Sequence, residues 1–293
     1  MRILAAIVLA CSLVPPAALA ADPPRALAAA DREAAGGRDV RVTLAQREIE
    51  TSFDVGRVAA NFGGGLLDSL IIASMDNKRQ VLSNSAWQRA EAAALPLREA
   101  LQGFDVDALA LATTRSALAQ ATWFSPREVT ASNDGSPAAL RAFIASSPAD
   151  HLAFVSYRYD LSPDFTQIRV YADLSLARKP GRNREIAPFY EQHLASIVQL
   201  SERSYEHRDN VARWSANDGA LARTALARAF AQLEQLIPYA LGLSHADVNA
   251  LADKKREKVF AAGLYGPLVR RGQQRPDDVL IWADGLVYVQ SLP

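Results

Sequence analysis

The alternation of apolar and polar residues is clearest in the middle of the chain, over residues 152–159 and 167–176. A turn rich in Pro and Asp separates the two segments. In the second segment one set of alternate positions is apolar: Ile168, Val170, Ala172, Leu174 and Leu176. A period of two on both sides of a turn predicts a β-hairpin with one buried face and one face toward solvent or a partner.

Further strands are predicted on both sides of this hairpin. Residues 40–55 alternate with one change of register, which indicates one long strand or two shorter ones. Residues 259–270 and 279–282 also have strand character. Asp284-Gly285 is a strong hairpin turn signal and predicts a final strand over residues 286–289.

Helical spacings of three and four occur in several segments between these strands. They predict helices at residues 84–101, 105–123, 138–144, 186–200 and 218–241. Asp105 and Ser244 are expected as N-caps, and Gly103 as a helix stop. One helix has an apolar stripe that we expect in the core: Ala222, Leu226, Phe230, Leu233 and Ile237.

These elements predict an α+β fold, a mainly antiparallel sheet with helices packed on one side. We expect residues 39–293 to form a single domain, with a long helical segment before a C-terminal β-hairpin. In that domain residues 181–258 are predicted to be mainly helical and 259–293 to form the hairpin. Residues 21–38 are rich in Ala, Pro, Gly and charge, so we expect a flexible tether there.

The first twenty residues predict export. Arg2 precedes an apolar run over residues 3–14, and the small residues Ala18-Leu19-Ala20 follow, which is typical of a secretory signal peptide. The run is shorter than the roughly 20 apolar residues that span a bilayer. Cleavage near Ala20 predicts a periplasmic or secreted protein of a bacterial cell envelope.

A lipoprotein leader is the alternative. Residues 8–11, Val-Leu-Ala-Cys, resemble the box in which the cysteine becomes the lipidated N-terminus, so Cys11 would anchor the protein to a membrane. Cys11 is the one cysteine of the sequence. Cleavage after Ala20 therefore leaves no thiol for disulfides, thiolate catalysis or cysteine metal sites.

The charge balance argues against a nucleic-acid partner. The chain has 32 Lys and Arg and 32 Asp and Glu, and loss of Arg2 with the leader leaves a formal net charge of −1. Proteins that bind a phosphate backbone usually show a basic excess or stripe. The densest basic run, residues 254–258, lies at the end of a predicted helix, where positive charge is favoured anyway.

A glycine-rich segment precedes the most apolar stretch. Gly63-Gly64-Gly65 leads into residues 66–73, which contain Asp68. The spacing fits neither a dinucleotide-binding loop nor a P-loop. A core helix after a tight turn is the simplest interpretation, and membrane association or oligomerisation through residues 58–72 is the alternative.

The sequence contains no catalytic or metal-binding signature. Each of its four histidines lies in a different predicted element: His151, His193, His207 and His245. Neither zinc-site spacings nor a G-x-S-x-G elbow occurs. We therefore predict no metal, no cofactor and no catalytic residue. Two carboxylates that meet in three dimensions could still serve a periplasmic hydrolase, which stays the alternative function.

The central hairpin supplies the candidate binding residues. It combines aromatic and arginine side chains, which are enriched at protein interfaces: Tyr157, Arg158, Tyr159, Arg169 and Tyr171. Cross-strand pairing in an ordinary sheet would also favour such residues. We expect a non-enzymatic envelope protein that acts by binding or assembly with another envelope component, a protein or a glycan.

Overall fold

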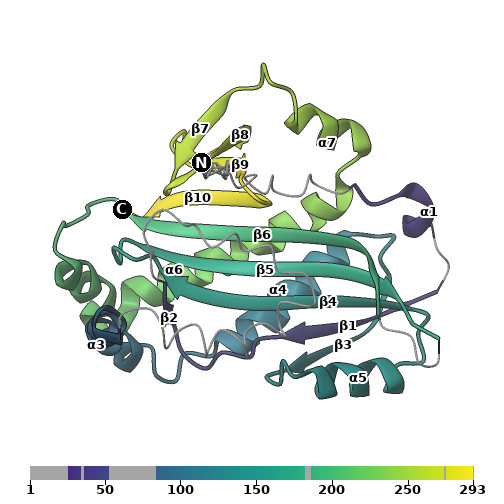
Figure 1. Cartoon of the computed structure of the whole chain (residues 1–293), viewed down its shortest axis with the longest axis horizontal. Coiled ribbons are helices and arrows are strands. Elements are labelled where there is room, and N and C mark those ends of the chain that lie inside the picture. Colours follow the sequence, from purple (N-terminus) through teal and green to yellow (C-terminus); the bar gives the residue numbers. More distant parts are fainter. Residues whose placement is uncertain (1–25, 34–35, 53–83, 182–185, 274, 293) are drawn as a thin grey trace, which may run out of the picture.

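The computed structural model describes residues 26–33, 36–52, 84–181, 186–273 and 275–292. Within these residues a ten-stranded sheet has the order β3-β1-β4-β5-β6-β10-β9-β8-β7, and β2 pairs with β4 (Figure 1). The strands are β1 (Arg38–Thr43), β2 (Glu50–Thr51), β3 (Pro126–Ser132), β4 (His151–Leu161), β5 (Gln167–Arg178), β6 (Pro188–Leu200), β7 (Lys258–Ala261), β8 (Leu264–Arg271), β9 (Val279–Trp282) and β10 (Leu286–Leu292). Strand β1 is parallel to β3 and β4, β2 is parallel to β4, and β10 is parallel to β6, whereas the other pairs are antiparallel. The predicted α+β class is confirmed.

Helices cover mainly one face of this sheet. Over the described residues they are α1 (Ala29–Arg32), α3 (Asn84–Ala100), α4 (Val106–Gln120), α5 (Pro137–Ser146), α6 (His207–Gly242) and α7 (His245–Leu251). Helices α3, α4 and α6 pack on one face of the sheet and form the main core with it. Helices α4 and α6 run behind the strands in Figure 1. Helix α5 packs on the other face. Strands β7 and β8 follow helices α6 and α7. The long helical segment therefore does not lead directly into the terminal β9–β10 hairpin.

The central hairpin is confirmed. Strands β4 and β5 pair from His151↔Arg178 to Leu161↔Ile168 without interruption. The turn between them is held by Asp164, whose carboxylate accepts hydrogen bonds from Ser162 and Thr166. The indole of Trp214, fully buried on α6, donates to the carbonyl of Phe165 in this turn at 2.8 Å.

The helix predicted over residues 186–200 is wrong, because Pro188–Leu200 form strand β6. It pairs with β5 on one edge and with β10 on the other. Its alternate residues from Tyr190 to Leu200 are buried against the helices, and Ala195 and Ile197 belong to a second apolar cluster on the opposite face. Burial on both faces removes the polar alternation that usually marks a strand. Residues 181–258 are therefore not mainly helical at their start.

Helix α6 contains the predicted core stripe, and all five of its residues are buried. The helix is broken at Ala216–Gly219, where Asn217, Asp218 and Gly219 have φ of 52°, 55° and 72°. A side chain at Gly219 would meet the backbone oxygen of Ala100 at 3.2 Å. Glycine suits this point, because it adopts the left-handed backbone without strain and leaves room for the close approach of α3.

The predicted helix ends are confirmed in the described residues. Asp105 caps α4 by accepting from the amide of Ala108 at 2.8 Å, and Gly103 before it has a φ of 73°. Ser244 and Asp247 form a capping box at the start of α7. The Gly63-Gly64-Gly65 segment, Asp68 and residues 58–72 lie outside the described residues.

Part of the segment predicted as a tether packs on the domain. Leu27 is buried in the main core, and Arg32 donates to the carbonyl of Leu243 at 2.9 Å. The guanidinium of Arg38, at the start of β1, is buried and donates to the carbonyls of Phe124 and Asp31. The expectation of a flexible tether therefore does not describe residues 26–33 and 36–38. Apolar Leu27 and the two arginines explain why they are held.

Candidate binding site on the face opposite the helices

Two separate elements, α5 and the β7–β8 hairpin, cover parts of the second face of the sheet. At one end α5 packs on Leu152, Phe154 and Ala177. At the other end residues of β7 and β8 pack on a cluster that includes Ala195 and Ile197. Between these covers, β4, β5 and β6 carry half-buried polar and aromatic side chains, which we call the polar strip: Ser156, Arg158, Asp160, Arg169, Tyr171, Asp173, Glu191 and His193.

Two of the predicted binding residues belong to the core instead. Tyr157 and Tyr159 point toward the helices, and each is 4% exposed. The hydroxyl groups of Tyr157 and Thr114 are hydrogen-bonded at 2.8 Å, and the Tyr157 ring packs on Phe230. Burial raises the pKa of Tyr159 to about 12. Because side chains alternate along a strand, these tyrosines and Arg158 cannot share one face, which corrects the prediction.

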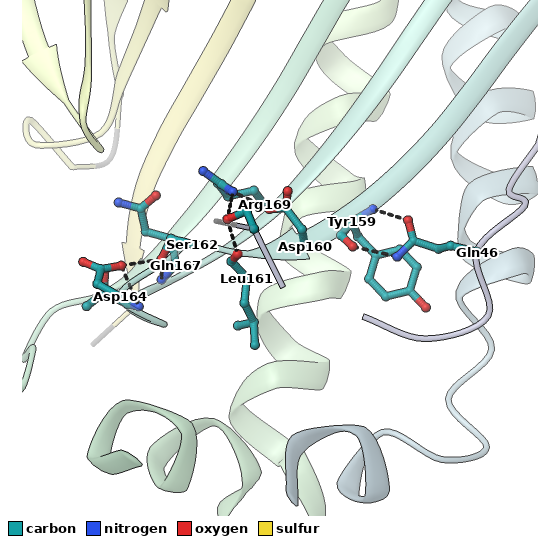
Figure 2. Close-up of polar contacts among 10 residues, drawn as sticks. Gln46, Tyr159, Asp160, Leu161, Ser162, Asp164, Gln167 and Arg169 are labelled. Atoms are coloured by element: carbon teal, nitrogen blue, oxygen red, sulfur yellow. Dashed lines mark hydrogen bonds and ion pairs between the residues drawn. The ribbon is translucent and has the colours of Figure 1, made fainter. Parts of the chain in front are cut away.

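Arg169 lies on the polar strip, where it holds parts of the fold together. Its Nε donates to Oδ1 of Asp160 at 2.6 Å (Figure 2). Its Nη2 donates to Oγ of Ser52, just after β2. Both side chains of the ion pair are less than a fifth exposed. Burial raises the pKa of Asp160, and the charge of Arg169 opposes that shift. Arg169 therefore joins β5 to β4 and to the end of β2.

The connection between β1 and β2 is fastened to the same region. The side-chain amide of Gln46 donates to the carbonyl of Tyr159 at 2.6 Å and accepts from its amide at 2.8 Å (Figure 2). These two bonds imitate one step of strand pairing along β4. They hold the connection between β1 and β2 against β4. The alternating segment is therefore divided into two strands that both pair with β4.

Arg158 and Tyr171 form a stacked pair at the centre of the polar strip. They are direct partners in the β4–β5 register, and the guanidinium carbon of Arg158 lies 4.3 Å from the centre of the Tyr171 ring. A cation at this distance is attracted by the ring face. Burial raises the pKa of the Tyr171 hydroxyl above its ordinary value.

His193 and Asp173 form a hydrogen-bonded dyad beside this stack. The two residues are partners in the β5–β6 register, and Nδ1 of His193 lies 2.7 Å from Oδ1 of Asp173. Their side chains are 29% and 27% exposed. The bond to Asp173 raises the pKa of His193, against the opposing effect of burial. With the proton on Nδ1, Nε2 is the acceptor nitrogen.

The register places a serine near the dyad, in the wrong position for a catalytic triad. Ser156 on β4 pairs with Asp173, which in turn pairs with His193. The carboxylate therefore lies between the hydroxyl and the imidazole. A serine nucleophile needs the imidazole as its neighbour, so this row does not activate Ser156.

Sequence reasoning missed Asp160, Asp173 and His193 as members of the site. The spacing in residues 186–200 predicts a helix, so the sequence does not reveal the register of His193 with Asp173. The signal that could have located it is the buried alternation of Tyr190, Leu194 and Val198 in β6. The four histidines do lie in different elements, as predicted: β4, β6, α6 and α7.

Metal-ligand clusters and membrane-spanning helices are absent from the described part of the chain. No group of three or more His, Cys, Asp or Glu side chains is placed to hold a metal ion there. None of the helices in those residues is long and apolar enough to cross a membrane. Comparison of the chain with protein-family models, with curated proteins and with solved structures finds no match.

Proposed function

We propose that this chain is an exported envelope protein that binds another envelope protein through its polar strip. The observation that carries the proposal is the Arg158–Tyr171 stack beside the Asp173–His193 dyad. The pattern of residues 1–20 supports export. Arginine and tyrosine dominate the energetics of many protein interfaces, where they supply charge, hydrogen bonds and rigid apolar area together.

The stack favours a protein over a glycan. A sugar ring is bound by an aromatic face, and one face of Tyr171 is already occupied by the guanidinium of Arg158. The strip also mixes positive and negative groups within adjacent strands, as in Arg158 beside Asp173. Such an arrangement matches a partner surface with charges of both signs.

Site-specific photo-cross-linking tests the proposal. A photoreactive phenylalanine is placed at Ser156 or Glu191, which flank the stack and the dyad without replacing them. The matched control carries it at Arg228, an exposed residue of α6 on the other side of the sheet. In cells that produce the chain, we expect one discrete protein adduct from each strip position and none from the control.

The result is made specific by a second substitution. Arg158→Ala in the cross-linker variants should reduce adduct yield at least about fivefold, since hot-spot truncations cost more than about 1 kcal/mol. Identical adducts from position 228, or adducts that persist after Arg158→Ala, would remove the strip as the interface. An adduct with a glycan instead of a protein would favour the other partner class.

A hydrolase is the second candidate function, because the dyad has the arrangement of a general base. Asp173 orients the imidazole, and Nε2 of His193 could take a proton from a water molecule. Hydrolysis of ester, amide or glycoside substrates by the purified chain, lost in His193→Gln and kept in His245→Gln, would support it. His245 is exposed on α7 and serves as the control.

The anchoring of the exported protein has its own test. Cleavage after Ala20 yields a mature chain that begins at Ala21, whereas lipidation retains Cys11 with a large added acyl mass. We propose the cleaved, unlipidated form. The intact mass of the protein from its native envelope distinguishes the two, and an acylated Cys11 would establish the lipoprotein instead.

A further inference from the structure

The β7–β8 hairpin presents an aromatic pair to its surroundings. Phe260 and Tyr265 are direct cross-strand partners, and they are 70% and 65% exposed. The pair Lys258↔Pro267 lies two residues away on the same side of the hairpin. Burial is the usual fate of such large rings, so two exposed partners on one small surface indicate a function for that surface.

The orientation of this pair is fixed by the opposite side of the hairpin. Val259, Ala261 and Leu264 pack against the apolar cluster around Ile281 and Val287. Because side chains alternate, that packing directs Phe260 and Tyr265 outward. The turn at Ala262-Gly263 has positive φ at both residues, 54° and 86°, as a tight hairpin turn requires. The outward surface is therefore held by a well-packed element.

Positive charge is concentrated around the hairpin. Between Asp253 and Arg275 the sequence has seven Lys and Arg and two Asp and Glu, in a chain whose formal net charge is zero. Three exposed lysines lie in or just before β7: Lys254, Lys255 and Lys258. The described residues include no ion pair with any of the three, whereas Arg271 is paired with Glu257.

We propose that the outward side of the β7–β8 hairpin docks on a membrane surface rich in anionic phospholipid. Aromatic rings settle at the level of lipid headgroups, and lysines near them attract anionic lipids. Lysine is depleted from the cores of protein interfaces, so this mixture of exposed lysines and rings fits a charged bilayer surface better than a protein. The docking surface is separate from the polar strip, and the two proposals do not depend on each other.

Vesicle co-sedimentation tests the proposal with the full chain. We expect binding to vesicles of phosphatidylglycerol and phosphatidylcholine, and much weaker binding to pure phosphatidylcholine. The joint change Phe260→Ser and Tyr265→Ser should lower the partition coefficient at least about tenfold, as should Lys254→Gln, Lys255→Gln and Lys258→Gln together. Tyr205→Ser is the matched control, because Tyr205 is a fully exposed aromatic residue away from the hairpin.

Hydrogen exchange locates the contact independently of these substitutions. Anionic vesicles should slow amide exchange in residues 258–267 of the unmodified chain. Thermal unfolding of each variant without lipid shows that its fold is intact. Equal binding to both kinds of vesicle, binding that the hairpin variants retain, or protection confined to other residues would each overturn the proposal.

Discussion

Asp173 and His193 are joined by a 2.7 Å hydrogen bond between adjacent strands β5 and β6. Asp284 and Arg158 also act on the imidazole, with opposite signs, but the bond to Asp173 has the largest effect on its pKa. Within a sheet, such a bond links the protonation of one side chain to the stability of the strands that hold it.

The first prediction concerns pH. Because the pKa of His193 is raised in the folded protein, its protonation stabilises the fold fully below the unfolded pKa of about 6.5 and less as the pH rises through the folded pKa. Asp173→Asn removes the main cause of that shift. Its cost in free energy of unfolding should therefore be larger at about pH 5.5 than at about pH 8.5. Urea unfolding at both values measures it, and an equal cost at both would contradict it.

The second prediction concerns the ion pair of Arg169. Arg169→Ala removes the hydrogen-bonded cation of the poorly solvated Asp160 carboxylate, so we expect a loss of about 2–4 kcal/mol at neutral pH. The double change Arg169→Leu and Asp160→Leu should cost less than this single change. Denaturant unfolding compares the two proteins. A single variant as stable as the parent would show that Arg169 is not structural.

The third prediction concerns the break in α6. Gly219 and Gly103 have nearly the same φ, 72° and 73°, but only at Gly219 would an added Cβ lie as close as 3.2 Å to Ala100. Gly103→Ala should cost about 1 kcal/mol from backbone conformation alone, and Gly219→Ala distinctly more. Thermal and urea unfolding of both variants measure the difference. Equal losses would mean that α3 yields to the added methyl group.

The fourth prediction concerns the core stripe of α6. Phe230 is 1% exposed and packs on the ring of Tyr157. Phe230→Ala should reduce the free energy of unfolding by about 3–5 kcal/mol and Leu226→Ala by about 2–5 kcal/mol. Arg228→Ala, on the exposed side of the same helix, should change it by less than about 0.5 kcal/mol. Similar losses of stability in all three variants would show that the buried side of α6 is not the one described.

Local patterns predicted the elements whose two faces differ. The β5 strand alternates buried Val170 and Leu174 with the strip residues Tyr171 and Asp173, so its pattern is evident in the sequence. Helix α6 likewise buries one stripe and exposes Arg228. In such elements, the arrangement of apolar residues follows directly from which side meets the core.

The polar strip could not be predicted because it depends on pairing between strands distant in sequence. Strand β6 is buried on both faces near Ala195 and Ile197, so its apolar run also suited a helix. With β6 misassigned, nothing in the sequence joined His193 to Asp173. The choice of Tyr157 and Tyr159 failed for a simpler reason, since alternation along β4 already separated them from Arg158.

Strand β10 completes the sheet by lying parallel to β6 and antiparallel to β9. Five described elements, α6, α7, β7, β8 and β9, lie between β6 and β10 in the chain, so one long edge of β6 stays unpaired until β10 has been made. Such long-range parallel pairing forms slowly, and an unpaired apolar edge invites aggregation. Folding of this sheet is therefore completed only when β10 pairs with β6, and until then the open edge of β6 is the part of the fold most exposed to wrong pairing.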